Sequence, residues 1–164
     1  MVHSSRTLWT RRAGVVVVAV VAALGAVSCG GAPAATRLLI EVSLAPHANR
    51  DSPVPVSFVA VKDQKFLEKI GQLTAQQWFA QREQFHRDDP SGQLFTEWEW
   101  EYVPGYTPPP TVIEVDGRAV AAFVYARYQS SADHRIRIGP QRKFRIELGD
   151  EDLRVRSIDV DRSP

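Results

Sequence analysis

The chain has 164 residues, a single cysteine and a formal charge of +1. This length suffices for one domain with a substantial core. Without the N-terminal 28 residues discussed next, 17 basic residues remain against 19 acidic ones, a formal charge of −2. The composition therefore excludes a polybasic surface for nucleic acid or anionic lipid.

Residues 1–28 have the organisation of an export signal. Three arginines and no acid precede an uncharged apolar run at 13–27. Because a helix needs about 20 residues to cross the hydrocarbon of a membrane, this run suits a signal peptide better than a permanent span. The small residues that end it lead directly to Cys29 and resemble the lipobox of bacterial lipoproteins, with Ala26 in place of the usual leucine.

The lipobox resemblance implies cleavage before Cys29, diacylglycerol on its thiol and a third acyl chain on the new amine. Residues 29–36 then form a lipidated tether without bulky apolar side chains, and residues 37–164 form the folded domain. The alternative is a spare thiol after an ordinary cleavage site, although exported cysteines normally come in pairs. Three acyl chains would hold the protein on a membrane, and Gly30 after the cysteine points to the outer membrane.

Two-residue alternation of apolar and polar side chains dominates the chain after the tether. Residues 38–44 and 54–60 are predicted to be half-buried strands. Asp116-Gly117 predicts a hairpin, and a parity shift between Val155 and Ile158 predicts a bulge. The remaining predicted strands are 95–103, 111–115, 118–128, 135–138, 142–148 and 153–160.

The period of the apolar residues changes between the second and third predicted strands. Phe66, Ile70 and Leu73 follow Asp63 at helical spacing, and residues 74–77 form a capping box that opens a helix. The sequence therefore predicts a mainly β fold, a β-sandwich of seven or eight short strands with a short helical insertion.

Residues 95–103 alternate acids with aromatics. Alternate residues lie about 6.6 Å apart along a strand, within the range of about 5 to 9.5 Å that separates glycosidase carboxyl groups. A solvated edge face over an aromatic core is the favoured interpretation, and a carboxylate pair or a sugar-stacking platform are its alternatives. The residues concerned are Glu97, Glu99, Glu101, Trp98, Trp100 and Tyr102.

No motif for catalysis or metal binding stands out. His47, His86 and His134 are far apart in the sequence, and HxxxH, CxxC, a carboxylate-rich calcium loop and GxSxG are all missing from it. We therefore expect no metal site, no catalytic residues and no enzyme activity, although composition alone does not exclude a Ser-His-Asp triad. The basic residues of the last strands are expected to form a solvated face rather than a docking patch; they are Arg135, Arg137, Arg142, Lys143, Arg145, Arg154 and Arg156.

The polar connection at residues 45–55 is the strongest candidate for a binding surface. It is long for a hairpin, is stiffened by Pro53 and Pro55, and joins two well-defined strands. Loops mounted on a rigid sandwich often carry binding residues. The alternative is an inert connector.

The order of elements from about Leu38 to Val160 resembles the TssJ lipoproteins of bacterial type VI secretion systems. The segment 55–61 followed by Phe66 matches the spacing of a family motif, and residues 121–123 match another. The chain departs from the family at 60–61, where a tyrosine region is usual, and at 134–135, where His-Arg replaces Trp-Arg.

The resemblance implies a transthyretin-like β-sandwich that its lipid anchors to the periplasmic face of the outer membrane. It also implies binding to the periplasmic part of an inner-membrane TssM-like protein, in a complex that includes a TssL-like protein, with no cofactor beyond the covalent lipid. In the family the loop between the first two strands contributes to that contact, and Asn49 is the residue that aligns. The corresponding residues are Pro46, His47, Ala48, Asn49, Arg50, Asp51 and Ser52.

Two other functions remain open at the level of the sequence. One is a surface glycoside hydrolase that uses two of Glu97, Glu99 and Glu101. The other is an envelope lipoprotein that binds glycan or peptidoglycan through the aromatic side of the strand at 95–103.

Overall fold

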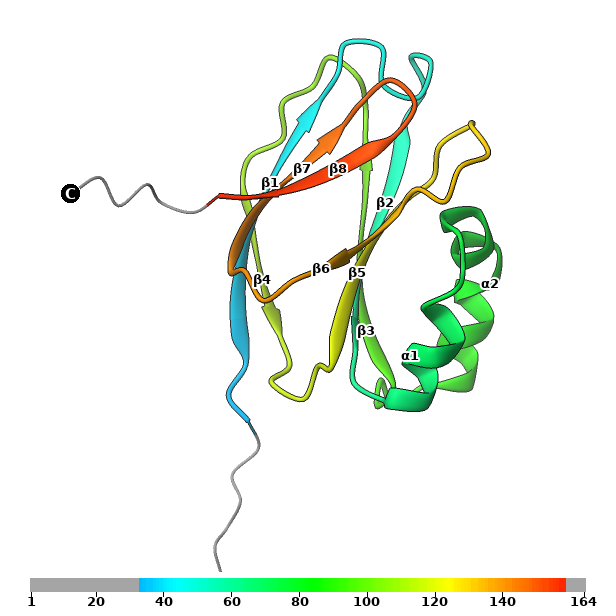
Figure 1. Cartoon of the computed structure of the whole chain (residues 1–164), viewed down its shortest axis with the longest axis vertical. Helices are drawn as coiled ribbons and strands as arrows, with labels where there is room; N and C mark the ends of the chain where they lie inside the picture. The colour runs from blue at the N-terminus through cyan, green and yellow to red at the C-terminus, as the bar shows by residue number, and fades with distance from the viewer. Residues whose placement is uncertain (1–32, 159–164) are drawn as a thin grey trace, which may run out of the picture. The chain divides into compact units, whose positions relative to one another are not determined.

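A computed structural model describes residues 33–158, and the predicted signal and Cys29 lie outside this range. Two four-stranded sheets pack face to face, and two helices cover the outer face of one of them (Figure 1). The predicted β-sandwich with a helical insertion is confirmed. The elements are β1 (Thr36–Leu44), β2 (Val54–Val61), α1 (Gln64–Ile70), α2 (Ala75–Asp88), β3 (Phe95–Tyr102), β4 (Thr111–Val115), β5 (Ala121–Ala126), β6 (Arg135–Ile138), β7 (Lys143–Leu148) and β8 (Leu153–Ser157).

The chain passes repeatedly from one sheet to the other. Sheet 1 has the strand order β4-β1-β7-β8, and sheet 2 has the order β3-β2-β5-β6. The pairing of β1 with β7 is parallel, whereas the other pairings of the described strands are antiparallel. Strands β1 and β2 therefore belong to different sheets, and the loop at 45–53 bridges one end of the sandwich.

The hairpin predicted at Asp116-Gly117 is wrong. A tight turn does form there, because the amide of Ala119 donates to the carbonyl oxygen of Asp116 at 2.9 Å. However, β4 pairs with β1 in sheet 1, and β5 pairs with β2 and β6 in sheet 2. A Cβ atom on Gly117 would lie 2.4 Å from the backbone oxygens of residues 33 and 34, so the glycine serves a close backbone approach at a crossing between sheets.

Two further predictions about strands need correction. The pairing of β7 with β8 is regular up to Ser157, where β8 ends, so the apparent change of parity reflects the end of a strand and not a bulge. Strand β2 was predicted to be half-buried, but nearly all its residues are buried. It lies inside sheet 2 and has the sandwich core on one side and the helices on the other.

The buried side chains form two clusters on opposite sides of sheet 2. The larger cluster fills the space between the sheets, where Phe58 stacks on Phe144 with ring centroids 6.0 Å apart. The smaller cluster lies beneath the helices, and its centre is Trp78, whose ring stacks 5.1 Å from that of Tyr125. Each large aromatic side chain buried in this way contributes about 1.5 to 3 kcal/mol through its apolar surface.

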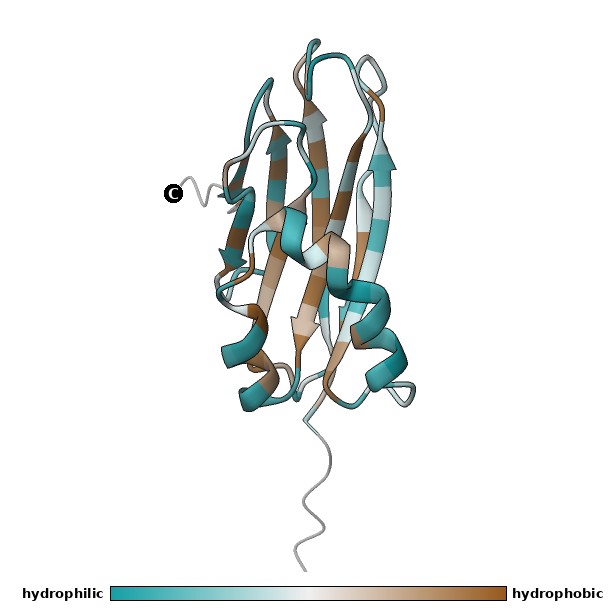
Figure 2. Ribbon diagram, turned by 90° about the vertical axis from the view of Figure 1, so that its right-hand side faces the viewer, coloured by the Kyte–Doolittle hydropathy of each residue, from teal (hydrophilic) through white to brown (hydrophobic). Residues whose placement is uncertain are grey.

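Local sequence signals determine where both helices begin. The carboxylate of Asp63 accepts a hydrogen bond from the amide of Phe66 at 2.7 Å, which caps α1. The predicted capping box between Thr74 and Gln77 is confirmed, with both reciprocal hydrogen bonds present. Figure 2 shows the helices lying across the outer face of sheet 2, with mainly hydrophilic residues along them and hydrophobic bands on the strands behind.

A buried carboxylate helps to hold α2 against the sheet. The side chain of Glu97 on β3 is only 6% exposed. It accepts hydrogen bonds from the hydroxyl of Ser57 and from the indole nitrogen of Trp78, the latter at 3.3 Å. His86 Nε2 lies 2.5 Å from its other oxygen, and Arg82 lies 3.8 Å away. The expectation of a solvated acidic face is therefore wrong for this residue, because α2 covers it.

Replacing Glu97 with alanine should lower the free energy of unfolding by about 3 kcal/mol. The change leaves the buried Ser57 hydroxyl and Trp78 indole without their charged acceptor. Urea denaturation monitored by tryptophan fluorescence measures the loss. The matched control is Glu114→Ala on β4, whose exposed ion pair with Arg37 spans 3.7 Å. It should change stability by less than about 0.5 kcal/mol, and equal effects of the two variants would contradict the role assigned to Glu97.

Candidate partner-binding surface

The loop between β1 and β2 is a tight turn with an unusual backbone. Asn49, Arg50 and Asp51 have consecutive positive φ angles of 51°, 56° and 60°. Asn and Asp tolerate this left-handed region better than other non-glycine residues, but an arginine there is uncommon. The conformation must therefore be stabilised by contacts with the rest of the domain.

Asn49 provides those contacts, because its polar groups join the loop to two other segments. Its side-chain nitrogen donates to the carbonyl oxygen of Pro53 at 2.8 Å. Its side-chain oxygen accepts from the backbone amide of Gln129 at 2.7 Å, and its own amide donates to the carbonyl oxygen of Asp150 at 2.9 Å. Gln129 also donates from its side chain to the hydroxyl of Ser52 at 2.7 Å. Asn49 is thus the anchor of the loop.

The structure divides the predicted partner-binding residues into two groups. Ala48 and Asn49 are buried, with exposed fractions of 0% and 4%, and Ser52 is half-buried. The exposed members of the loop are Pro46, His47, Arg50 and Asp51. Only this second group presents side chains to a partner while the loop keeps its conformation.

An exposed ion pair closes the tip of the loop. His47 Nδ1 lies 2.9 Å from a carboxylate oxygen of Asp51. This hydrogen bond and the negative charge of Asp51 raise the pKa of His47 above 6.5, and the nearby charge of Asp150 acts in the same direction. The loop therefore presents a cationic imidazole beside carboxylates at mildly acidic pH.

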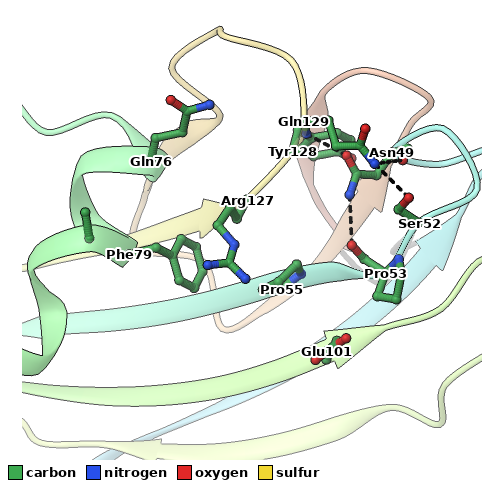
Figure 3. Close-up of a pocket in the computed structure, with 11 residues that line it drawn as sticks. Asn49, Ser52, Pro53, Pro55, Gln76, Phe79, Glu101, Arg127, Tyr128 and Gln129 are labelled. Carbon is green, nitrogen blue, oxygen red and sulfur yellow. Dashed lines mark hydrogen bonds between the residues drawn. The ribbon is translucent and has the colours of Figure 1, made fainter.

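A groove of about 570 Å³ lies between this loop and α2 (Figure 3). Figure 3 shows the ring of Phe79 and the guanidinium of Arg127 side by side, with Pro55 and then Pro53 to the right of the guanidinium. The guanidinium carbon of Arg127 lies 5.2 Å from the centre of the Phe79 ring, within the range of a cation–π contact. The lining residues are Asn49, Ser52, Pro53, Pro55, Gln76, Phe79, Ala80, Glu101, Arg127, Tyr128 and Gln129.

His134 joins the β5–β6 turn to the β7–β8 turn. Like Asn49, it is buried and has a positive φ angle, here 44°. Its Nδ1 lies 2.9 Å from the carboxylate of Asp152, and its Nε2 lies 2.9 Å from the hydroxyl of Ser130. Its ring packs on Tyr128, whose hydroxyl donates to the carbonyl oxygens of Gly149 and Asp152. The β5–β6 and β7–β8 turns are therefore fastened together.

Ser130, His134 and Asp152 have the connectivity of a Ser-His-Asp triad, but their other contacts do not suit nucleophilic catalysis. Nε2 of His134 also faces the carbonyl oxygen of Ser130 at 3.2 Å, which can only accept a hydrogen bond. The Ser130 hydroxyl has the carbonyl oxygen of Glu151 as its own acceptor at 3.0 Å. A general base needs a nitrogen lone pair that receives the hydroxyl proton of the nucleophile, whereas here the Ser130 hydroxyl donates to a carbonyl oxygen.

The structure also decides between the interpretations of the acid-and-aromatic strand. Trp98 packs edge-on against Phe58 in the sandwich core, with ring centroids 5.7 Å apart, and Trp100 packs against the same core. Tyr102 is buried, and burial raises its pKa to about 12. These side chains therefore form no open platform for stacking sugar rings.

Glu97 and Glu99 of this strand do not form an accessible catalytic pair. Glu97 is covered by α2, and Glu99 pairs with Arg82, which also approaches Glu97. Arg82 Nη1 contacts Glu99 as an ion pair without the direction of a hydrogen bond. Neither of these two glutamates lines the five most prominent grooves of residues 33–158, whereas Glu101 lines the groove beside the loop.

Within residues 33–158, no group of three His, Cys, Asp or Glu side chains is arranged to hold a metal ion. No helix of the described residues has the length and apolar character needed to span a membrane.

No protein-family model and no curated protein sequence matches the chain. Solved structures with similar folds do match. TssJ1, a type VI secretion lipoprotein from Pseudomonas aeruginosa, is 19% identical with a TM-score of 0.56, over 77% of this chain and 98% of that one. Lip, a membrane-bound type VI component from Serratia marcescens, is 15% identical and has a TM-score of 0.58. This match covers 77% of the present chain and 99% of the Lip chain.

A third match is a chain from a structure of the type VI TssM C-terminal domain from EAEC. It is 16% identical, has a TM-score of 0.53, and covers 76% of the present chain and 99% of its own. At these identities the comparisons define a class of fold, and that fold is the one seen in TssJ lipoproteins. The resemblance inferred from the sequence is therefore confirmed at the level of the fold.

Sequence reasoning missed the groove and the loop anchor. Gln129 lies 80 residues from Asn49, and it falls just after a predicted strand without any local signal that joins the two. Arg127 and Phe79 were likewise unremarkable, since they come from a strand end and from a helix. Only the pairing of β2 with β5 and the packing of α2 bring these residues together.

Replacing Asn49 with alanine should destabilise the domain by about 2 to 3 kcal/mol. The variant loses two side-chain hydrogen bonds and places alanine at a positive φ. Chemical denaturation measures the loss, and hydrogen exchange at the Gln129 amide should become markedly faster. As a control, Asp51→Asn keeps a residue that tolerates positive φ and should stay within about 0.5 kcal/mol of wild type. Unchanged protection of the Gln129 amide would contradict the anchoring role.

The pKa of His47 should lie above 6.5 and should fall towards 6.5 in Asp51→Asn. Since the folded pKa is raised, the ion pair is fully formed below pH 6.5 and is lost as the pH rises through the folded pKa. A titration of the imidazole proton resonances by NMR measures both values. Identical pKa values in wild type and Asp51→Asn would show that Asp51 is not the cause.

Proposed function

We propose that this protein is an outer-membrane lipoprotein of a type VI secretion envelope complex. In this proposal Cys29 carries the diacylglycerol and N-acyl chains, and the domain lies on the periplasmic face of the outer membrane. The loop at 46–52 binds the periplasmic part of a TssM-like inner-membrane protein, in a complex that also contains a TssL-like protein. Its role is assembly and not catalysis.

The observation that carries the proposal is the likeness of the whole described domain to type VI lipoproteins. The match covers 98% to 99% of the solved TssJ1 and Lip chains and 77% of this chain. The lipobox-like segment that ends at Cys29 precedes this domain by only a few residues. Independent features of the sequence and of the fold therefore support the same class of protein.

The geometry of β1 supports a function in tethering. Strand β1 has nine residues, which span about 27 Å at the usual rise per residue. The start of β1 and the loop at 45–53 lie at opposite ends of the sandwich (Figure 1). A lipid attached before β1 would thus leave the loop pointing away from the anchored end, and confinement at a surface raises the effective concentration for a partner that reaches across the periplasm.

A comparison of three forms in native cells tests this function. The forms are wild type, Cys29→Ser, and a loop variant that combines His47→Ala, Arg50→Asn and Asp51→Asn. The loop variant changes only exposed side chains and keeps Asn49, so it should fold like wild type. Membrane fractionation and co-purification of the TssM-like protein are the measurements, and a melting curve confirms the fold of each form.

Wild type should retain the TssM-like protein, the loop variant should lose most of it, and Cys29→Ser should leave the outer membrane. Full retention by a folded loop variant would contradict the assignment of the loop. Recovery of no TssM-like protein with wild type would contradict the proposed function as a whole.

A further inference from the structure

The floor of the groove is a row of three residues across sheet 2. Pro55 on β2 pairs with Glu101 on β3. On its other side, the carbonyl oxygen of Pro55 accepts a hydrogen bond from the amide of Arg127 at 2.8 Å. Glu101 and Arg127 are both exposed. The groove therefore presents a negatively charged and a positively charged side chain, Glu101 and Arg127, on either side of Pro55.

Arg127 has no carboxylate within 4 Å among residues 33–158, in contrast to the other arginine on the same aromatic ring. Arg82 lies 5.1 Å from the centre of the Phe79 ring and is neutralised by Glu99. Arg127 lies 5.2 Å from that centre, and its charge is not neutralised by any ion pair of the described domain. A guanidinium held on an aromatic face keeps its planar set of donors available for a carboxylate.

Glu101 is similarly free of any cation within 4 Å in the described domain, although its strand neighbour Glu99 is paired. The backbones of Glu101 and Arg127 are separated by two strand spacings, about 9.6 Å. Two residues of opposite charge on backbones at this separation can be matched by an extended ligand whose residues of complementary charge have a similar backbone spacing.

We infer that the groove binds an extended segment of the protein partner in which an acidic and a basic side chain are three residues apart. In a polyproline II conformation, residues three apart lie on the same face and about 9.3 Å from one another. The acid would pair with Arg127 and the base with Glu101, while Pro55 and Phe79 supply apolar contacts. This inference rests on the proposed function for the identity of the partner, since the groove adjoins the loop at 46–52.

Synthetic peptides test the groove without assuming the partner. The probes are Pro-Glu-Pro-Pro-Lys-Pro, its charge-swapped form Pro-Lys-Pro-Pro-Glu-Pro, and Pro-Gln-Pro-Pro-Gln-Pro, each capped at both ends. They are titrated into the full chain in detergent micelles, with NMR detection of the Arg127 and Gln129 resonances. The variants are Arg127→Glu, the milder Arg127→Gln, Glu101→Lys, and Lys143→Glu as a matched control on sheet 1, whose melting temperatures are compared first.

At least one charged peptide should bind about tenfold more tightly than the uncharged one, a difference of about 1.4 kcal/mol. Arg127→Glu should abolish that preference, Arg127→Gln and Glu101→Lys should reduce it, and Lys143→Glu should leave it within about twofold, because charge reversal turns attraction into repulsion only within the groove. Equal binding of all three peptides, or the same loss in Lys143→Glu, would overturn the inference.

The same variants are then titrated with the purified periplasmic domain of the TssM-like protein. Weaker binding in both the loop variant and Arg127→Glu supports the function and the groove together. If the loop variant is weakened but Arg127→Glu binds like wild type, the groove inference fails and the function stands. If wild type does not bind this domain, the proposed function fails, and the peptide titrations alone decide whether the groove recognises paired charges.

Discussion

The burial of β2 on both faces is the constraint on which the rest of the structure depends. One face packs into the core between the sheets, and the other face, which includes Val59, requires a second cover. The helices supply it, with Trp78 at the centre of the covered cluster. Ser57 is the polar residue of β2 at zero exposure, and its hydroxyl is satisfied by Glu97 and by the indole of Trp78 at 3.0 Å. The insertion is therefore required by the apolar character of the strand it follows.

Local features of the fold could be predicted from the sequence, but the partners of each strand could not. The capping box at Thr74 and the alternating strands depend on neighbouring residues and are found where predicted. The turn at Asp116-Gly117 is also local, but whether it joins paired strands depends on contacts far away in the chain, such as the approach of residues 33–34. The prediction that Glu97 is solvated failed for the same reason. Alternation along a strand shows which residues share a face, but it does not show which element covers that face.

The position of the loop between two strands could be predicted, but the way in which its residues are organised could not. The length and the prolines of the loop marked it as a binding surface, and Asn49 was its best-aligned residue. The structure places Asn49 inside, where it organises the loop through Gln129, and leaves exposed neighbours such as Arg50 as the side chains accessible to another molecule. A residue aligned at an interface can thus act by shaping the surface, and its substitution then lowers stability and binding together. Separating these effects requires variants of the exposed side chains alone.

The strained backbone of the loop explains why the hydrogen bonds of Asn49 matter. Three consecutive left-handed residues cost about 1 kcal/mol or more each, and the buried hydrogen bonds of Asn49 offset part of this cost. A loop held in one conformation loses little conformational entropy when a partner binds. Beside the loop, the backbones of Glu101 and Arg127 are both joined to Pro55 at the end of sheet 2. If the proposed partner binds at this end of the sandwich, the buried contacts of Asn49 would favour binding by holding the loop in place, although the partner itself would not touch them.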